Sequence, residues 1–130
     1  MGAVYMLSAV EAIESVRQGI SIANLDRMVQ DLSIDREVLL GILGISTRTL
    51  QRKFKANDRL SPMASDRLSR VHRIFHLATE IFGDEKKAAE WLKSPSRALS
   101  NELPIKLLDT DLGTQQVEQE LRKIEFGFVF

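Results

Sequence analysis

Apolar residues recur every three or four positions along most of the chain, which is the period of a helix with one buried face. The alternation of apolar and polar residues that is typical of strands does not occur before the last few positions. The pattern therefore predicts an all-α fold. Its longest apolar stripe follows Ser61-Pro62, a good helix start, and comprises Ala64, Leu68, Val71, Phe75, Ala78 and Phe82.

Capping residues divide this pattern into separate helices. Ser8 and Glu11 match a capping box, and Gly19 supplies a stop eleven residues after Ser8. The last helix is expected to begin at Thr114 and to carry Val117, Leu121 and Ile124 on one side. The other expected helix starts are Asn24, Ser33 or Asp35, Ser46, Ser61, Asp84 and Leu103, and the expected stops are Gly44, Ala56, Gly83 and Ser94.

The composition is that of an ordinary globular protein of 130 residues, which is enough for one domain or two very small ones. The chain has no Cys, and this excludes disulfides, thiolate chemistry and Cys-based zinc sites. The first residues lack a basic region and a long apolar core, and no apolar run approaches the roughly 18 residues of a membrane span. We expect a cytoplasmic protein without a membrane partner.

The net charge of zero hides a local excess of positive charge. Between Ile45 and His76 there are eight basic and only two acidic residues. Such a block indicates an anionic partner, unless it is only the solvated face of a helix. Arg67, Arg70 and Arg73, which belong to this block, have both readings: additional phosphate contacts or solvation of the long helix.

The segment DREVLLGILGISTRTLQRKF has the form of a helix-turn-helix, two short helices joined by a tight turn containing Gly44. The expected apolar anchors are Val38, Leu39 and Ile42 in the first helix, Ile45 in the turn, and Leu50 and Phe54 in the second helix. In such a unit the second helix enters the major groove of DNA, where Arg pairs with guanine and Gln with adenine. The candidate DNA-binding residues are Ser46, Thr47, Arg48, Gln51, Arg52 and Lys55.

Metal and enzyme chemistry find little support in the sequence. His72, His76 and Glu80 are spaced at four residues on the long helix, but ligands strung over two turns do not converge, and we expect no metal and no cofactor. Asp109 and Asp111 flank a turn, where they fit helix caps better than an acid–base pair. No nucleophile elbow or phosphate loop is present, so we expect no enzyme activity.

The chain ends on EFGFVF, and three of its six Phe residues occupy the last five positions. Chain ends are usually polar and tolerant of change, so this apolar end needs a partner surface. Two readings stay open. Phe126 can pack under Trp91 and Leu121 in the core of the chain itself, or the aromatic residues can enter a pocket of another protein.

From about Leu60 onward the chain resembles the Xre/MbcA/ParS-like antitoxins, whose toxins are RES-domain proteins. The resemblance rests on the order and spacing of several elements rather than on one motif, and the helix-turn-helix is a further family feature. The chain departs from the family at Ser100-Asn101, where a Gly-Gly-like turn is common, and in its Phe-Val-Phe end. The matching segments are SDRLSRVHRI, IFGDEKKAAEWL, SPSRAL, LPIKLLDTDLG and KIEFG.

The resemblance implies a homodimer that binds the operator DNA of its own operon and holds a cognate RES-type toxin inactive. RES toxins consume NAD or transfer ADP-ribose from it, and the antitoxin's C-terminal region covers their active site. The resemblance places a helix-turn-helix domain in residues 1–61 and a toxin-binding and dimerisation domain in residues 62–130, which share the long helix. The toxin-binding candidates are Arg122, Glu125, Phe126, Gly127, Phe128, Val129 and Phe130.

A plain helix-turn-helix regulator is the alternative, with a C-terminal half that only dimerises. Leu103, Leu107 and Leu108 are candidate dimer contacts under either reading. An adjacent gene for a RES-type protein would favour the antitoxin.

Overall fold

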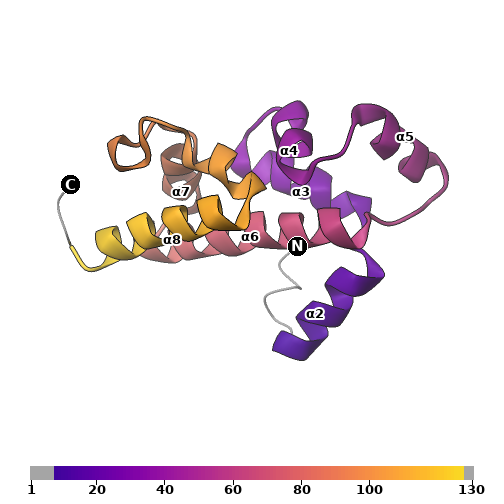
Figure 1. Ribbon diagram of the computed structural model, residues 1–130, viewed down its shortest axis with the longest axis horizontal. Helices are drawn as coiled ribbons and strands as arrows, with labels where there is room; N and C mark the ends of the chain where they lie inside the picture. Colours follow the sequence, from indigo (N-terminus) through magenta and orange to yellow (C-terminus); the bar gives the residue numbers. More distant parts are fainter. Residues whose placement is uncertain (1–7, 128–130) are drawn as a thin grey trace. The chain divides into compact units, whose positions relative to one another are not determined.

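The computed structural model describes residues 8–127, and this part of the chain is helical (Figure 1). Extended pairing within this range is limited to two isolated bridges, Ser21 with Arg59 and Ser96 with Glu102. The predicted all-α fold is therefore confirmed. The elements in chain order are α2 (Ala9–Gln18), α3 (Ile22–Leu32), α4 (Arg36–Leu43), α5 (Thr47–Lys55), α6 (Pro62–Phe82), α7 (Glu85–Leu92), the short 3₁₀ helices η1 (Arg97–Leu99) and η2 (Pro104–Asp109), and α8 (Asp111–Glu125).

The chain divides into two compact units, Met1–Ser69 and Arg70–Phe130. The long helix α6 runs through this division, so the two units share it, as predicted (Figure 1). The sequence-based boundary between residues 61 and 62 stays a prediction.

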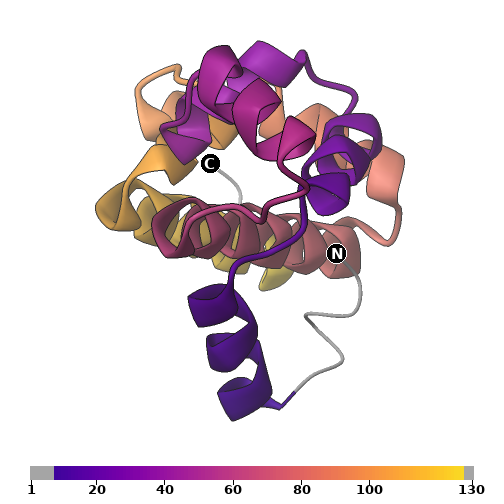
Figure 2. The same cartoon turned by 90° about the vertical axis from the view of Figure 1, so that its right-hand side faces the viewer.

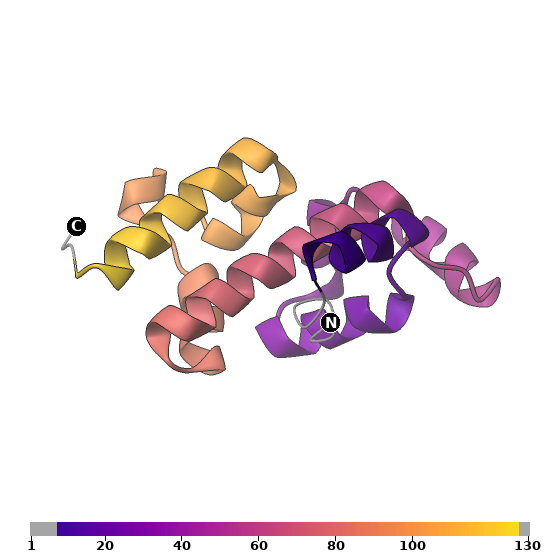
Figure 3. The same cartoon turned by 90° about the horizontal axis from the view of Figure 1, so that it is seen from below.

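Each unit has its own arrangement of helices. In the first unit α2 stands apart from α3, α4 and α5, which agrees with its lack of a buried residue (Figure 2). In the second unit α8 lies alongside the later turns of α6 (Figure 3), and Arg73 on α6 reaches Glu118 on α8.

Several helix starts lie where the capping residues predict them. The side chain of Ser8 accepts a hydrogen bond from the N–H of Glu11, and Ser46 accepts one from Thr49. Asp84 does the same for the N–H of Lys87. Each of these bonds satisfies a backbone donor that the first turn of a helix leaves without an internal partner.

Two predicted starts are wrong. Helix α3 begins after Ser21 rather than at Asn24, whose Nδ2 instead donates to the hydroxyl of Ser21. Helix α8 begins after Thr110, whose hydroxyl accepts from the N–H of Gly113, while Thr114 is buried inside the helix. Thr110 therefore caps α8 in place of the flanking Asp109 and Asp111.

The two cores are built from aliphatic side chains at helical spacing. The predicted α6 stripe is buried except at its end, where Phe82 is half-buried and its ring centroid lies 6.0 Å from that of Trp91. Leu108 is fully buried in the second core, so it is not the surface contact that the sequence suggested, whereas Leu103 and Leu107 are half-buried. The larger fully buried side chains are Leu25, Met28, Leu32, Leu39, Leu43, Leu60 and Leu68 in the first unit and Ile74, Leu92, Ile105, Leu108 and Leu121 in the second.

The turn at Ser100-Asn101 survives without glycine. Both residues adopt the left-handed conformation, with φ of 59° and 63°. Asn visits this region more readily than most residues, which explains how the departure from a Gly-Gly-like turn is accommodated.

Candidate functional site

Helices α4 and α5 form the predicted helix-turn-helix around Gly44. This glycine adopts a left-handed conformation with φ of 73°, and its N–H donates to the carbonyl of Gly41. The next N–H, of Ile45, donates to the carbonyl of Leu40 at 3.1 Å, which closes the end of α4. The left-handed backbone favours glycine here, whereas the side-chain end of Arg67, 2.5 Å from where a Cβ atom would lie, is flexible enough to move aside.

A single buried residue, Leu50, attaches α5 to the core. The remaining side chains on α5 are exposed or half-buried. Phe54, predicted as a second anchor, is 71% exposed, and this prediction is wrong. It follows Leu50 by one helical turn, but α5 ends at Lys55 and the core does not extend far enough to cover it.

All six candidate DNA-binding residues are exposed on α5 or at its cap Ser46. Five of them, with Phe54, form two adjacent stripes, each at spacings of four and three residues. The cationic stripe comprises Arg48, Arg52 and Lys55. The second stripe carries a hydroxyl, an amide and an aromatic ring, and we call it the reading stripe because Thr and Gln can contact base edges. It comprises Thr47, Gln51 and Phe54.

The cationic stripe has no counter-ion within the part of the chain that the structure describes. Among residues 8–127, none of its three side chains makes a hydrogen bond or an ion pair. Three cations on one short helix, open to solvent and uncompensated, suit contacts with the phosphate groups of DNA.

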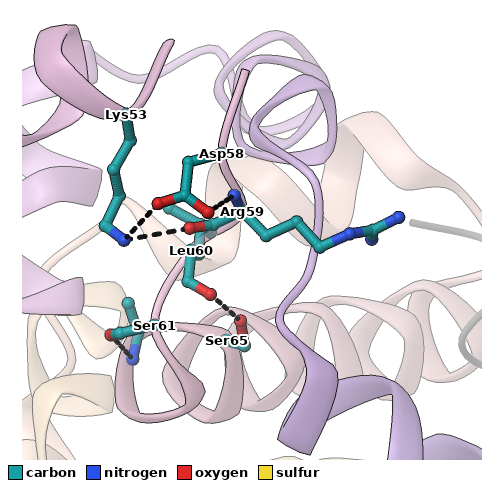
Figure 4. A network of polar contacts seen from close by, with 7 residues as sticks. Lys53, Asp58, Arg59, Leu60, Ser61 and Ser65 are labelled. Atoms are coloured by element: carbon teal, nitrogen blue, oxygen red, sulfur yellow. Dashed lines mark hydrogen bonds and ion pairs between the residues drawn. The ribbon is translucent and has the colours of Figure 1, made fainter. Parts of the chain in front are cut away.

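Neighbouring cations are engaged within the protein. Nζ of Lys53 lies 3.5 Å from Oδ2 of Asp58 and donates to the carbonyl of Arg59 at 3.1 Å (Figure 4). The N–H of Arg59 donates to Oδ1 of Asp58 at 2.8 Å. This N–H and then the charge of Lys53 lower the pKa of the Asp58 carboxyl below its ordinary value of 3.8. Lys53 therefore fastens the end of α5 to the following turn.

Arg70 and Arg73 on α6 are likewise engaged. Nη1 of Arg70 donates to the carbonyl of Leu108, and Nη1 of Arg73 lies 3.3 Å from Oε2 of Glu118. Both contacts lie within the second unit, where they fasten η2 and α8 to α6. They give these two arginines a structural role beside the two readings that the sequence left open.

The toxin-binding candidates described by the structure lie at the end of α8. Nη1 of Arg122 pairs with Oε1 of Glu125 at 3.1 Å. Phe126 caps the helix and is 72% exposed, so the reading that buries it under Trp91 and Leu121 is wrong. Gly127 follows with φ of 78°. Phe128, Val129 and Phe130 lie outside the described residues.

An exposed stripe runs along the whole of α8. We call it the α8 stripe: its residues are spaced by three and four positions, and a large apolar side chain stands at each end. Leu112 is 69% exposed and Phe126 is 72% exposed, and the distance along the helix between them is about 21 Å. The α8 stripe comprises Leu112, Gln115, Gln119, Arg122 and Phe126.

The face of α8 opposite the α8 stripe packs into the second core. Thr114, Val117 and Leu121 are buried in the second core. Oε1 of Glu120, which is also buried, lies 3.0 Å from Nζ of Lys123. One face of α8 thus belongs to the core, and the α8 stripe is exposed to solvent.

The two histidines of α6 differ in burial. His72 is buried, whereas Nε2 of His76 lies at the surface, 3.1 Å from Oε1 of Glu80. Within the described residues, His, Asp and Glu side chains do not gather in threes that could hold a metal ion. Of the helices in residues 8–127, α6 included, none combines the length and apolarity that a bilayer crossing needs.

Comparison with known proteins assigns a family description to each half of the chain. Residues 11–73 match the antitoxin Xre-like helix-turn-helix domain. Residues 77–127 match the antitoxin Xre/MbcA/ParS C-terminal toxin-binding domain. The first match contains α5 and both of its stripes, and the second contains the α8 stripe.

Individual relatives cover most of the chain. An antitoxin Xre of Yersinia enterocolitica is 30% identical over 116 residues, which are 88% of this chain and 78% of that protein. An antitoxin Xre of Photorhabdus laumondii is also 30% identical over 88% of this chain and 78% of its own length. A Prs ADP-ribosylating antitoxin of a Sphingobium species is 28% identical over 96% of this chain and 84% of its own length.

Proposed function

The chain belongs to the Xre antitoxin family, and we propose that it neutralises a cognate RES-domain toxin by covering the toxin's active site with its C-terminal region. The α8 stripe carries the proposal, because it ends in an exposed Phe126 inside the segment that matches a toxin-binding domain. The name of the Sphingobium relative refers to ADP-ribosylation, which supports a toxin that consumes NAD or transfers ADP-ribose from it.

The proposed contact has a physical basis in the chemistry of the α8 end. Exposed aromatic side chains are typical anchors of protein interfaces, and a cleft that accepts NAD is deep enough to take a ring. The pair of Arg122 and Glu125 offers hydrogen bonds beside Phe126. We propose that Gly127, Phe128, Val129 and Phe130 continue this contact. The antitoxin itself needs no cofactor and no metal for this role, because occlusion is steric.

The proposal includes a second activity, repression of the chain's own operon through the helix-turn-helix. The residues proposed to contact DNA are those predicted from the sequence, Ser46 and the five on α5. A single small unit makes few base contacts, so we propose that a homodimer binds two half-sites. Both partners, operator DNA and toxin, place the protein in the cytoplasm.

A plain helix-turn-helix regulator remains the second candidate function. It is supported by the counter-ion-free cationic stripe, which fits DNA whether or not a toxin exists. In this case α8 would only pack within the second unit and contribute to contacts between two copies of the chain. Because the two functions differ in the role of the C-terminal region, one experiment separates them.

That experiment first establishes by sequencing that a gene for a RES-type protein lies beside this one, and then measures NAD in cells that express its product. The antitoxin is expressed from an unrelated promoter as the full chain, as a chain ending at Glu125, and as Phe54→Ala. Phe54 is a matched control because it is as exposed as Phe126 but lies on α5. Circular dichroism of the purified chains confirms that each is folded.

We expect the full chain and Phe54→Ala to preserve NAD and the truncated chain to fail. Protection by the truncated chain would move the inhibitory surface to the remainder of the second unit. Failure of the full chain, together with no co-purification of the two proteins, would leave the regulator as the better function.

A further inference from the structure

Phe54 is the one member of the reading stripe that neither the core nor the proposed DNA contacts explain. Its side chain is 71% exposed on a helix whose other outward residues are all polar or charged. A single exposed apolar side chain needs no partner by itself, but an aromatic ring beside the polar and cationic side chains of this helix suits a partner that presents an apolar group among polar ones.

The position of Phe54 on α5 defines what that partner can be. It follows Gln51 by three residues, so the two side chains are neighbours on one face of the helix. Thr47 lies one turn before Gln51 on the same face. The nine residues of α5 extend over about 13.5 Å, and the major groove, roughly 12 Å wide, admits a helix. A ring near the end of α5 can thus share the groove with Gln51.

The major groove offers one strongly apolar group, the C5 methyl of thymine. The major-groove edge of an A·T pair presents the N7 and N6 atoms of adenine, which suit the amide of Gln, followed by the O4 atom and the C5 methyl group of thymine. The reading stripe places an amide and a phenyl ring in the matching order. The cationic stripe beside it supplies phosphate contacts that would hold α5 in the groove.

We propose that Phe54 is a base-reading residue whose ring packs against the C5 methyl of a thymine, adjacent to an adenine bound by Gln51. The inference rests on the proposed DNA-binding function and adds a specificity determinant to it. It predicts that each half-site contains at least one thymine whose methyl group, rather than its hydrogen-bonding edge, is recognised.

The test uses the full chain and a DNA duplex selected by it from a randomised library. Each thymine of this duplex is replaced in turn by deoxyuridine, which removes the methyl group and keeps every hydrogen-bonding atom. Dissociation constants are measured by fluorescence anisotropy at one salt concentration, because phosphate contacts make affinity depend on salt. The proteins are the natural chain, Phe54→Ala, Phe54→Leu and Gln51→Ala.

We expect uracil at one position per half-site to weaken binding of the natural chain about four-fold, the effect of one buried methyl group. Phe54→Ala should bind the thymine and uracil duplexes equally, whereas Phe54→Leu should retain part of the difference. Gln51→Ala should bind more weakly but still distinguish thymine from uracil. Since Phe54 is largely exposed, these variants should fold as the natural chain does.

Equal sensitivity to uracil in the natural chain and Phe54→Ala would overturn the inference, as would a natural chain that is insensitive at every thymine. If Phe54→Ala lost affinity by the same factor on both duplexes, the difference between thymine and uracil would persist, and this outcome would assign the ring to a different contact and also overturn the inference. These outcomes leave DNA binding intact. A natural chain that enriches no sequence from the library would instead overturn the DNA-binding proposal, and this inference with it.

Discussion

The hydroxyl group of Ser65 accepts a hydrogen bond of 2.8 Å from the backbone N–H of Ile20, a residue 45 positions earlier. It also donates to the carbonyl of Leu60 at 3.4 Å (Figure 4). Ser65 is fully buried, so this one hydroxyl satisfies a donor and an acceptor that water cannot reach. The contact fastens the segment before α3 to the first turns of α6 within the first unit.

Replacement of Ser65 by Ala should therefore destabilise the protein by about 1–3 kcal/mol, the range for a buried backbone group that loses its partner. Ser69→Ala is the matched control, since Ser69 lies one turn later on α6, is half-buried and makes no side-chain hydrogen bond among residues 8–127. It should be neutral or slightly stabilising. Urea unfolding followed by circular dichroism measures both, and equal stabilities of the two variants would contradict the role given to Ser65.

The Asp58 carboxyl predicts a dependence of stability on pH. Its pKa is lowered in the folded chain by the N–H of Arg59 and then by Lys53, so folding favours the charged form. The contribution is present at pH values above the ordinary pKa of 3.8 and is lost as pH falls through the lower, folded value. Asp58→Asn should thus have a lower urea midpoint than the natural chain at pH 7, and the two midpoints should converge as the pH falls below 3.8. A difference that stays constant as the pH is lowered would exclude this cause.

Substitution of glycine by alanine should have opposite effects on stability at Gly113 and Gly41. Both lie inside helices, where Gly→Ala usually stabilises by about 0.5–1 kcal/mol. At Gly41 a Cβ atom would meet open space, so Gly41→Ala should show that gain. At Gly113 the same atom would overlap the carbonyl oxygen of Leu107, which belongs to the backbone and cannot turn aside. Gly113→Ala should therefore lose about 1–3 kcal/mol in the same unfolding assay. A gain at both positions would show that η2 and α8 are less tightly packed than the structure indicates.

The α8 stripe predicts that toxin binding has an anchor far from the chain end. Under the proposed function, Leu112→Ser should weaken the toxin complex roughly ten-fold, the effect of an interface residue worth more than about 1 kcal/mol. Met63→Ser is the control, because Met63 is 66% exposed and lies at the start of α6 in the first unit. Isothermal titration with the purified toxin would measure both. Unchanged affinity in Leu112→Ser would confine the contact to the end of α8 and the residues after it.

Local signals made much of this architecture predictable from the sequence. Ser8, Ser46 and Asp84 each cap a helix through a bond to an N–H three residues later, so the sequence alone places these starts. The sequence placed the start of the last helix at Thr114 instead of Thr110. A glycine, Gly113, lies inside this helix because the carbonyl of Leu107 approaches closely, a packing effect that no local pattern reveals. Phe54 follows Leu50 by four residues, which is the spacing of a core residue. It is nevertheless exposed, because the core does not extend far enough to cover it.

The cationic stripe predicts how DNA affinity should respond to salt. Each phosphate contact contributes about 0.9 to the slope of log affinity against log salt concentration, so Arg48→Ala with Arg52→Ala should reduce the slope by about two. Lys53→Ala removes a cation from the same helix, but Lys53 is engaged with Asp58 and the carbonyl of Arg59, and its loss should leave the slope unchanged. Fluorescence anisotropy over a range of salt concentrations measures the slopes on a duplex from upstream of the gene. An unchanged slope in the double variant would remove α5 from the DNA interface, while a reduced slope in Lys53→Ala would show that its contacts open when DNA binds.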